Sequence, residues 1–379
     1  MTARTGGSFV LDDPAPIVDA LRADGWRVIG PRLGDSAIVY DEIETADDLP
    51  RGFVDEQDGG HYRLRESGNE RWFDYVVGPQ NWKKWLFPAR QKLWSASRTE
   101  DGFAIEPHRV DFPKTAIFGA RACEIAAIEI QDRVFDNGDF ADAGYRHRRD
   151  NTLIVAVQCA RSAPTCFCSS MNTGPRAEAG FDIALTELED GEFLVECGSD
   201  RGAEILERID APAAGTAAVA AAKEAARAVT EQAARMQMRS MPENIAGLLK
   251  DNLEHPRWAD VADRCLSCAN CTLACPTCFC SDVEDVNDLS GDHTERWRVW
   301  DSCFSLDFSY IHGGAVRRST LSRYRQWMTH KLSSWHDQFD TSGCVGCGRC
   351  ITWCPVGIDI TEEAAAFAAE PADAGGVET

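Results

Sequence analysis

Two cysteine runs in the C-terminal third of the chain share one spacing. Each run has three cysteines separated by two residues, a fourth cysteine after three more residues, and then a proline. Three thiols at this spacing can surround one [4Fe-4S] cluster, while the fourth points away to a second cluster. We therefore predict two [4Fe-4S] clusters whose fourth ligands are exchanged between the runs. The first set is Cys265, Cys268, Cys271 and Cys354, and the second set is Cys344, Cys347, Cys350 and Cys275.

Structural zinc is the alternative for these runs. Zinc sites typically use pairs of C-x2-C rather than triplets followed by a Cys-Pro step, so the two complete copies favour iron-sulfur ligation. The chain between the runs is much longer than a compact two-cluster ferredoxin uses, and we expect helices to fill it. This arrangement resembles the α-helical ferredoxins, in which a helical bundle holds two clusters.

A third group of cysteines lies in the N-terminal half. Cys123 starts a predicted helix directly after the predicted strand 115–120, and Cys159 ends the predicted strand 152–159. If these strands are parallel, both thiols lie at the carboxyl edge of one sheet, where open α/β sheets form their ligand crevice. Cys166 and Cys168 follow in the next loop. We predict a third metal centre held by Cys123, Cys159, Cys166 and Cys168, preferably another [4Fe-4S] cluster, with zinc or buried free thiols as the alternatives.

The remaining cysteines have less distinctive surroundings. Cys278, Cys280 and Cys303 lie close to the first run in the sequence, and the string PTCFC occurs at both Pro164 and Pro276. These three thiols are candidate ligands of a further centre, and a role without a metal is an equal alternative. Cys197 falls in a predicted hairpin strand, where a core position is expected.

The elements that must position the N-terminal thiols follow a β-α-β order. A short β-branched strand leads into a helical pattern, and the next strand follows it, which favours a parallel sheet. Further on, two strand-like segments flank a Glu-Asp-Gly turn and predict a hairpin. We therefore expect an α/β domain with a partly parallel sheet. The predicted strands are 26–30, 37–43, 115–120 and 152–159.

These patterns predict an α/β domain and an all-α, α-helical ferredoxin-like dicluster domain joined by a connector. The α/β domain occupies residues 1–205 and includes the third cysteine group. An Ala-rich helical connector covers 206–250, and the dicluster domain covers 251–363. The small, acidic end at 364–379 is expected to be a flexible tail.

Composition excludes several classes of function. Asp and Glu total 61 against 39 Lys and Arg, and the resulting charge of −22 disfavours binding to nucleic acid or to an anionic membrane. No apolar run reaches the length of a membrane span, and the N-terminus lacks the pattern of a signal peptide, so a cytoplasmic protein is expected. Neither a G-x-G-x-x-G fingerprint, a P-loop nor a nucleophile elbow is present, and we expect no catalytic residue in this chain.

Several segments resemble a known family. GARACEIAAIEIQDRVF, CARSAPTCFCSSMNTGP, WDSCFSLDFSYIHGG and CVGCGRCITWCPVGIDI are similar to the β subunit of soluble, NAD(P)-linked [NiFe] sulfhydrogenases, and the electron-transfer subunit of anaerobic sulfite reductases is similar in the same places. The resemblance implies that the eight motif cysteines bind two clusters in an electron-transfer subunit. Its partners would be a flavin subunit that handles NAD(P)H and a catalytic partner. That partner would be the small and large hydrogenase subunits, or else a sirohaem sulfite reductase subunit; the stretches YRHRRD to SSMNTGP and HGG to RYRQWMTHKL favour the hydrogenase.

Overall fold

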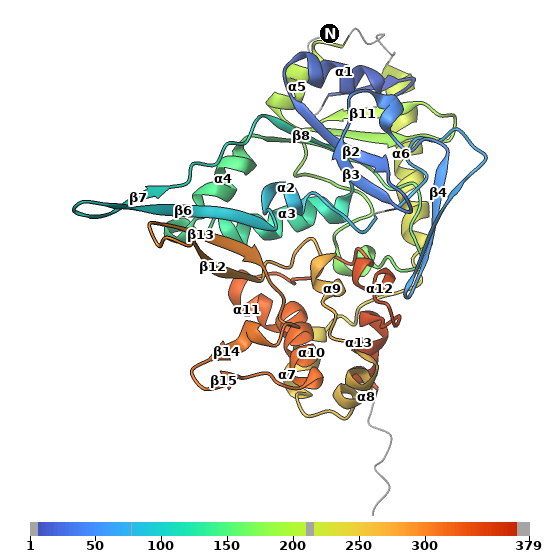
Figure 1. Ribbon diagram of the computed structural model, residues 1–379. Coiled ribbons are helices and arrows are strands. Elements are labelled where there is room, and N and C mark those ends of the chain that lie inside the picture. The colour runs from blue at the N-terminus through green and yellow to red at the C-terminus, as the bar shows by residue number, and fades with distance from the viewer. Residues whose placement is uncertain (1–6, 77, 210–215, 370–379) are drawn as a thin grey trace, which may run out of the picture.

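A seven-stranded mixed sheet forms the centre of the N-terminal half (Figure 1). The computed structural model describes residues 7–76, 78–209 and 216–369. Strand order is β1-β11-β10-β9-β8-β2-β3, and the four central strands β10, β9, β8 and β2 are parallel. The predicted α/β domain with a partly parallel sheet is therefore confirmed. The strands are β1 (Ser8–Leu11), β2 (Arg27–Leu33), β3 (Ile38–Glu42), β8 (Thr115–Ala120), β9 (Thr152–Val157), β10 (Ile183–Glu187) and β11 (Phe193–Cys197).

Helices cover both faces of this sheet, which explains why every residue of β8 and β9 is buried. On one face, α1 (Ala15–Ala23) and α5 (Asp200–Leu206) share a core with Phe118 and Val155. On the other, α3 (Ala122–Phe135) packs on Ile117 and Ile154, and α4 (Ala143–Asp150) adds Tyr145 to the same core. The crossover from β8 through α3 and α4 to β9 is thus the β-α-β unit that the sequence predicted.

The segment predicted as a helical connector contains two separate helices. The first, α6 (Thr216–Arg235), packs against β1 and β11, where Ala222 and Ala226 contact Leu194. The second, α7 (Ile245–Asp251), instead contributes Ile245 and Leu249 to the core of the C-terminal half. Residues 210–215 of the predicted connector lie outside the described residues.

Short helices surround an aromatic core in the C-terminal half. This core contains Trp258, Phe304, Tyr324 and Trp327. Five of the motif cysteines belong to it or pack against it, namely Cys265, Cys271, Cys344, Cys350 and Cys354. The last helix, α13, continues to Ala368, so the first residues of the predicted tail are helical. Residues 370–379 lie outside the described residues. The helices are α8 (Arg257–Arg264), α9 (Asn270–Leu273), α10 (Thr320–Thr329), a π-helical turn η5 (His330–Ser334), α11 (Trp335–Phe339), α12 (Arg349–Thr352) and α13 (Ile360–Ala368).

The prediction of an all-α C-terminal domain is wrong, because this region also contains two strand pairs. The alternating segment β13 (His293–Trp300) pairs with β12 (Ser281–Asn287) on one side and with β6 (Arg90–Thr99) on the other. A four-stranded sheet, β12-β13-β6-β7, therefore joins the two halves and projects to one side in Figure 1. The other strands here are β7 (Gly102–Pro107), β14 (Tyr310–Ile311) and β15 (Gly314–Ala315).

Two smaller elements also connect the halves. The hairpin of β4 (Phe53–Asp58) and β5 (His61–Glu66) reaches α12, where the Gly60 amide donates to the Ile351 carbonyl at 3.1 Å. The short helix α2 (Lys83–Leu86) packs against α4, and its first residue is buried and donates from Nζ to the Cys278 carbonyl at 3.2 Å. Within the described ranges, none of the helices combines the length and the apolar character needed to cross a membrane.

Candidate metal centres

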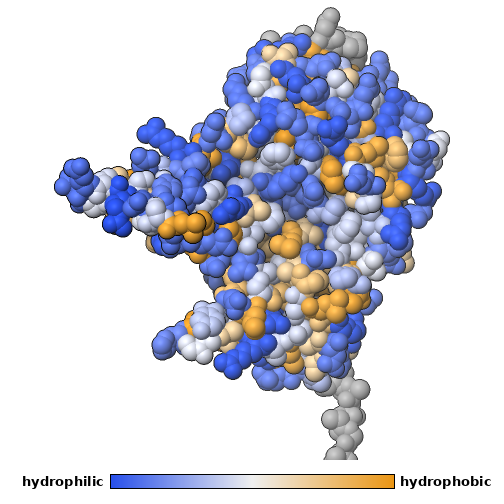
Figure 2. Space-filling view, in the orientation of Figure 1, coloured by the Kyte–Doolittle hydropathy of each residue, from blue (hydrophilic) through white to orange (hydrophobic). Residues whose placement is uncertain are grey.

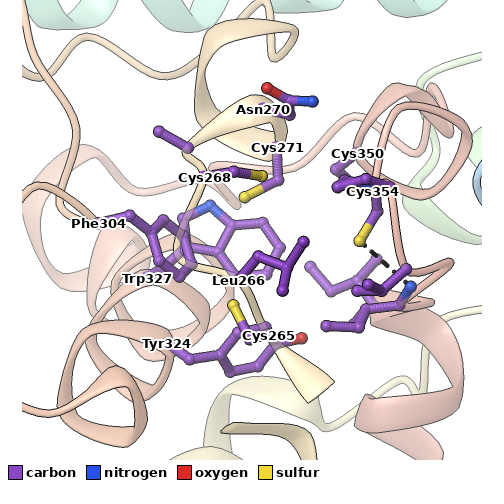
Figure 3. A pocket seen from close by; sticks show the side chains of 15 residues that line it. Cys265, Leu266, Cys268, Asn270, Cys271, Phe304, Tyr324, Trp327, Cys350 and Cys354 are labelled. Atoms are coloured by element: carbon purple, nitrogen blue, oxygen red, sulfur yellow. Dashed lines mark hydrogen bonds between the residues drawn. The ribbon is translucent and has the colours of Figure 1, made fainter. Parts of the chain in front are cut away.

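The first cysteine set lines one cavity in the C-terminal half (Figure 3). Cys265, Cys268 and Cys271 come from the loop before α9 and from α9 itself, whereas Cys354 follows α12. They line a cavity walled by Phe304, Tyr324 and Trp327, and Cys350 reaches the same cavity. The fourth cysteine of the second run therefore lies with the triplet of the first run, which is the placement that exchanged fourth ligands require.

Both runs have the same backbone curl. The residues on either side of the second cysteine of each run, Ser267 and Ala269 in the first and Gly346 and Gly348 in the second, all have positive φ. This curl turns backbone amides toward sulfur: the Ser267 amide lies 3.4 Å from the Cys265 Sγ, and the Gly346 amide lies 3.5 Å from the Cys344 Sγ. Such N-H···S hydrogen bonds are among the features that set the potentials of iron-sulfur clusters.

The second set is gathered around a buried lysine. Cys344, Cys347 and Cys350 each interact electrostatically with Cys275 of the first run, so this set is also brought together. Lys331 donates from Nζ to the Cys275 Sγ at 3.4 Å and to the Gly343 carbonyl at 3.0 Å. Burial raises the pKa of the Cys344 thiol to about 12, and the Lys331 ammonium opposes that rise. A bound metal would keep these thiols deprotonated.

The third set converges at the carboxyl edge of the parallel strands. Cys123 lies in the first turn of α3, Cys159 follows β9, and Cys166 and Cys168 come from the loop after it. Burial raises the pKa of Cys168 to about 12, and the charge of Cys159 adds to this rise. Cys123, Cys166 and Cys168 each also interact electrostatically with Cys347, so the third set lies beside the second.

Arg121 supplies a positive charge to the third set. Its guanidinium is buried and donates to the carbonyl oxygens of Phe73 at 3.2 Å and Tyr75 at 2.9 Å. Burial raises the pKa of the neighbouring Cys159 thiol, and the Arg121 charge lowers it in part.

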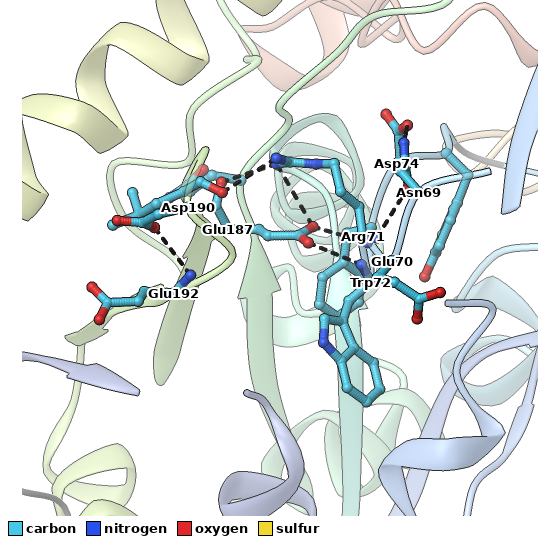
Figure 4. A network of polar contacts seen from close by, with 12 residues as sticks. Asn69, Glu70, Arg71, Trp72, Asp74, Glu187, Asp190 and Glu192 are labelled. Atoms are coloured by element: carbon cyan, nitrogen blue, oxygen red, sulfur yellow. Dashed lines mark hydrogen bonds and ion pairs between the residues drawn. The ribbon is translucent and has the colours of Figure 1, made fainter. Parts of the chain in front are cut away.

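A network of polar contacts holds the chain segment that positions Arg121 (Figure 4). Glu187 at the end of β10 is buried and accepts hydrogen bonds from the amides of Trp72 at 2.9 Å and Phe73 at 3.0 Å. The Arg71 guanidinium lies 3.8 Å from the same carboxylate. Burial raises the pKa of Glu187, and Arg71 and the two amides oppose this rise. The network thus fixes the carbonyl groups that hold Arg121 beside Cys159.

The remaining cysteines fall into two kinds. Cys280 and Cys303 hydrogen-bond to each other through their thiols, and Cys278 does the same with Cys275. Cys197 lies apart from all the sets, buried in the core beneath the sheet, as its strand position predicted. Among the residues that the structure describes, no group of three or more His, Cys, Asp or Glu side chains could hold a single metal ion.

Comparison with known proteins supports iron-sulfur binding by the C-terminal half. Residues 264–358, which include all eight motif cysteines, match the family model of a 4Fe-4S dicluster domain. Over 343 residues the chain is 35% identical to sulfhydrogenase 2 subunit beta of Pyrococcus furiosus, an alignment that covers 88% of this chain and 90% of that protein. The chain belongs to the sulfhydrogenase β-subunit family. No solved structure matches it.

Membership of the sulfhydrogenase β-subunit family makes this chain an iron-sulfur electron-transfer protein. Residue patterns identified the cysteine sets but missed the buried cations beside them. Lys83, Arg121, Lys331 and Arg349 are each buried, yet their local sequence resembles that of exposed basic residues. Of these four residues, only Arg349 could have been identified from the sequence as a neighbour of a cluster, because it lies between two cysteines of the second run.

In this sulfhydrogenase β-family chain, Gly346 allows the second and third sets to approach each other. Its φ is +63°, and a Cβ at this position would lie 2.6 Å from the Cα of Cys168. We expect Gly346→Ala to destabilise the fold by about 1–2 kcal/mol through the left-handed backbone and by a further 1–3 kcal/mol or so through overpacking.

The matched control for this substitution is Gly291→Ala. Gly291 also has a positive φ of +72°, but a Cβ there would meet no atom within 4 Å. Thermal unfolding under anaerobic conditions should therefore show a clearly larger loss for the Gly346 variant. Equal losses of stability in the two variants would mean that the close approach of the second and third cysteine sets at Gly346 does not limit the stability of the fold.

Proposed function

We propose that this chain is the electron-transfer subunit of a [NiFe] hydrogenase complex. In this proposal it carries three [4Fe-4S] clusters and relays electrons between a flavin subunit that uses NAD(P)H and the small and large hydrogenase subunits. A bound [4Fe-4S] cluster supplies reversible one-electron chemistry at each set of thiols. The 35% identity to a sulfhydrogenase subunit supports the hydrogenase partner over a sulfite reductase partner.

This proposal rests on the contacts that link each of the three cysteine sets to the next. Cys350 of the second set reaches the cavity of the first set, and Cys347 interacts with three thiols of the third set. A relay needs such closely spaced redox sites, because each electron must pass from one site to the next. The cysteine sets therefore form a line from the C-terminal half to the parallel sheet.

The protein's own residues adjust the charge along this line. Arg121 lies beside the third set, Arg349 and Lys331 lie beside the second, and all three are buried. Positive charge near a cluster favours its reduced form and raises its potential. The first set contrasts with the others, since its cavity is walled by aromatic and aliphatic side chains.

The first set also reaches the surface, where a partner could dock. Cys268 is exposed, and Leu266, Leu273 and Val356 near it are exposed apolar residues. Hydrophobic surface gathers around α9 and α12 in Figure 2. Exposed apolar surface of this kind is typical of a protein-protein contact. We propose this face as one end of the relay.

Reconstitution with the partner subunits tests the proposed function. The isolated chain should oxidise neither NAD(P)H nor hydrogen, whereas addition of the flavin and hydrogenase subunits should give hydrogen-dependent reduction of NAD(P). Cys268→Ser should abolish this coupled activity, and Cys197→Ser should leave it unchanged. Turnover by the isolated chain, or full coupled activity in the Cys268 variant, would count against the proposal.

A further inference from the structure

Three cysteines outside the three proposed sets lie close together because of the β12-β13 hairpin. Cys280 directly precedes β12, Cys303 is the third residue after β13, and the hairpin pairs Ser281 with Trp300. The Asp301 amide donates to the Cys280 carbonyl at 2.9 Å, which holds the two ends of the hairpin together. The two thiols hydrogen-bond to each other, and Cys278 interacts electrostatically with Cys280.

Two buried lysines flank this cysteine group. Lys83 is 2% exposed; its Nζ donates to the Cys278 carbonyl at 3.2 Å and lies 4.1 Å from the centre of the Trp300 ring. Lys331 is 3% exposed and interacts electrostatically with Cys278, Cys280 and Cys303 as well as with Cys275. The thiols of Cys278 and Cys280 are also among the charged neighbours of Lys83.

Within the described part of the chain, the two lysines have no carboxylate partner. Neither Lys83 nor Lys331 forms an ion pair there, and Asp301, which interacts with Cys280, is not bonded to either ammonium group. A buried ammonium group is costly unless an anion lies near it. The anions that this arrangement offers to both lysines are thiolates, namely those of the cysteine group together with Cys275 of the second set.

We propose that Cys278, Cys280 and Cys303 hold a fourth iron-sulfur centre, whose negative charge is balanced by Lys83 and Lys331. Thiolates are the ligands that select iron-sulfur clusters over hard cations. Three cysteines leave one iron without a thiolate ligand, and the Asp301 carboxylate is the candidate for that position. The centre would lie beside both the first and the second sets, because Cys303 interacts with Cys271 and Cys278 with Cys275.

The test compares the double variant Cys280→Ser/Cys303→Ser with Cys197→Ser in the full chain purified anaerobically. We expect the double variant to lose about four iron atoms and four sulfides per chain, since a cubane cluster holds four of each. The spectra of the other clusters should persist, and Cys197→Ser should keep the wild-type content. Unchanged iron in the double variant would overturn the proposal, and a disulfide formed by the wild-type pair on mild oxidation would identify a redox dithiol instead.

A second variant covers the case in which the double variant does not fold. Lys83→Met keeps all the thiols and removes one of the two charges. Because Lys83 interacts with Cys275 of the second set as well as with Cys278 and Cys280, the midpoint potentials of two clusters should fall while the other potentials stay unchanged. A fall in one potential only, or no change in any potential, would also overturn the proposal. These two tests of the fourth centre do not depend on the proposed three-cluster relay. The relay proposal fails only if the wild-type chain lacks iron at the other sets.

Discussion

The variant Cys350→Ser should lose a cluster and much of its folded protein together. Cys350 lies with the second cysteine set, also reaches the cavity of the first set, and packs against the aromatic core of the C-terminal half. Because the unfolded chain has no preformed site, cluster binding contributes directly to folding. We expect at least about four iron atoms fewer per chain, from four irons in one cubane, together with a strong loss of soluble yield.

The control for this variant is Cys197→Ser, which changes a buried thiol far from the proposed centres. It should keep its iron and cost stability only through the small change in core packing. Far-ultraviolet circular dichroism and iron analysis of the soluble fractions measure both quantities. A Cys350→Ser protein that is fully folded and soluble while lacking a cluster would contradict the coupling between the metal and the fold.

Breaking the ion pair of Arg349 and Glu124 should give the second large effect. Arg349 of α12 lies 2.6 Å from the Glu124 carboxylate of α3, and their side chains are 1% and 0% exposed. The pair therefore joins the two halves of the molecule inside the protein. Arg349→Met removes the cation that pairs with the buried Glu124 carboxylate and leaves it only the hydrogen bonds from the Tyr40 hydroxyl and the Arg121 amide. We therefore expect a loss of about 3–5 kcal/mol.

The double variant Arg349→Met/Glu124→Gln separates the cost of the unpaired charge from the loss of the pair. It should be more stable than Arg349→Met alone, because no uncompensated carboxylate remains. The exposed pair of Arg227 and Glu224 on α6 serves as a control, and Arg227→Gln should cause no clear change. Anaerobic thermal unfolding measures all four proteins. A loss in Arg349→Met no larger than that of the surface control would show that this ion pair does not hold the halves together.

Local patterns were sufficient to predict the parallel centre of the sheet and that Cys354 lies near the first triplet. Strands such as β8 and β9 are buried on both faces, so their apolar runs mark them directly. The motif spacing likewise predicted that Cys354 would lie with the first triplet, and the β-α-β order predicted that Cys123 and Cys159 would meet. In each case the required information lies in patterns of neighbouring residues, such as the apolar runs and the Cys-Pro step that each run carries.

Features that depend on distant partners could not be predicted in this way. The segment His293–Trp300 alternates like a strand, but nothing in its own sequence identifies β6, almost two hundred residues earlier, as its partner. The same holds for Lys83 and Lys331, whose burial follows from the thiols around them and not from neighbouring residues. A lysine in a polar segment is ordinarily exposed, so sequence patterns alone favour the wrong environment for both.

Iron and acid-labile sulfide per chain, measured on anaerobically purified protein together with EPR of the reduced state, test the central claim most directly. With four irons in each cubane, the eight motif cysteines account for about eight iron atoms and the third set raises the total to about twelve. The fourth centre would bring it to about sixteen. A chain that holds fewer than eight or so, or that binds zinc in place of iron and shows no reduced-cluster signal, would contradict the account of this protein as an electron relay.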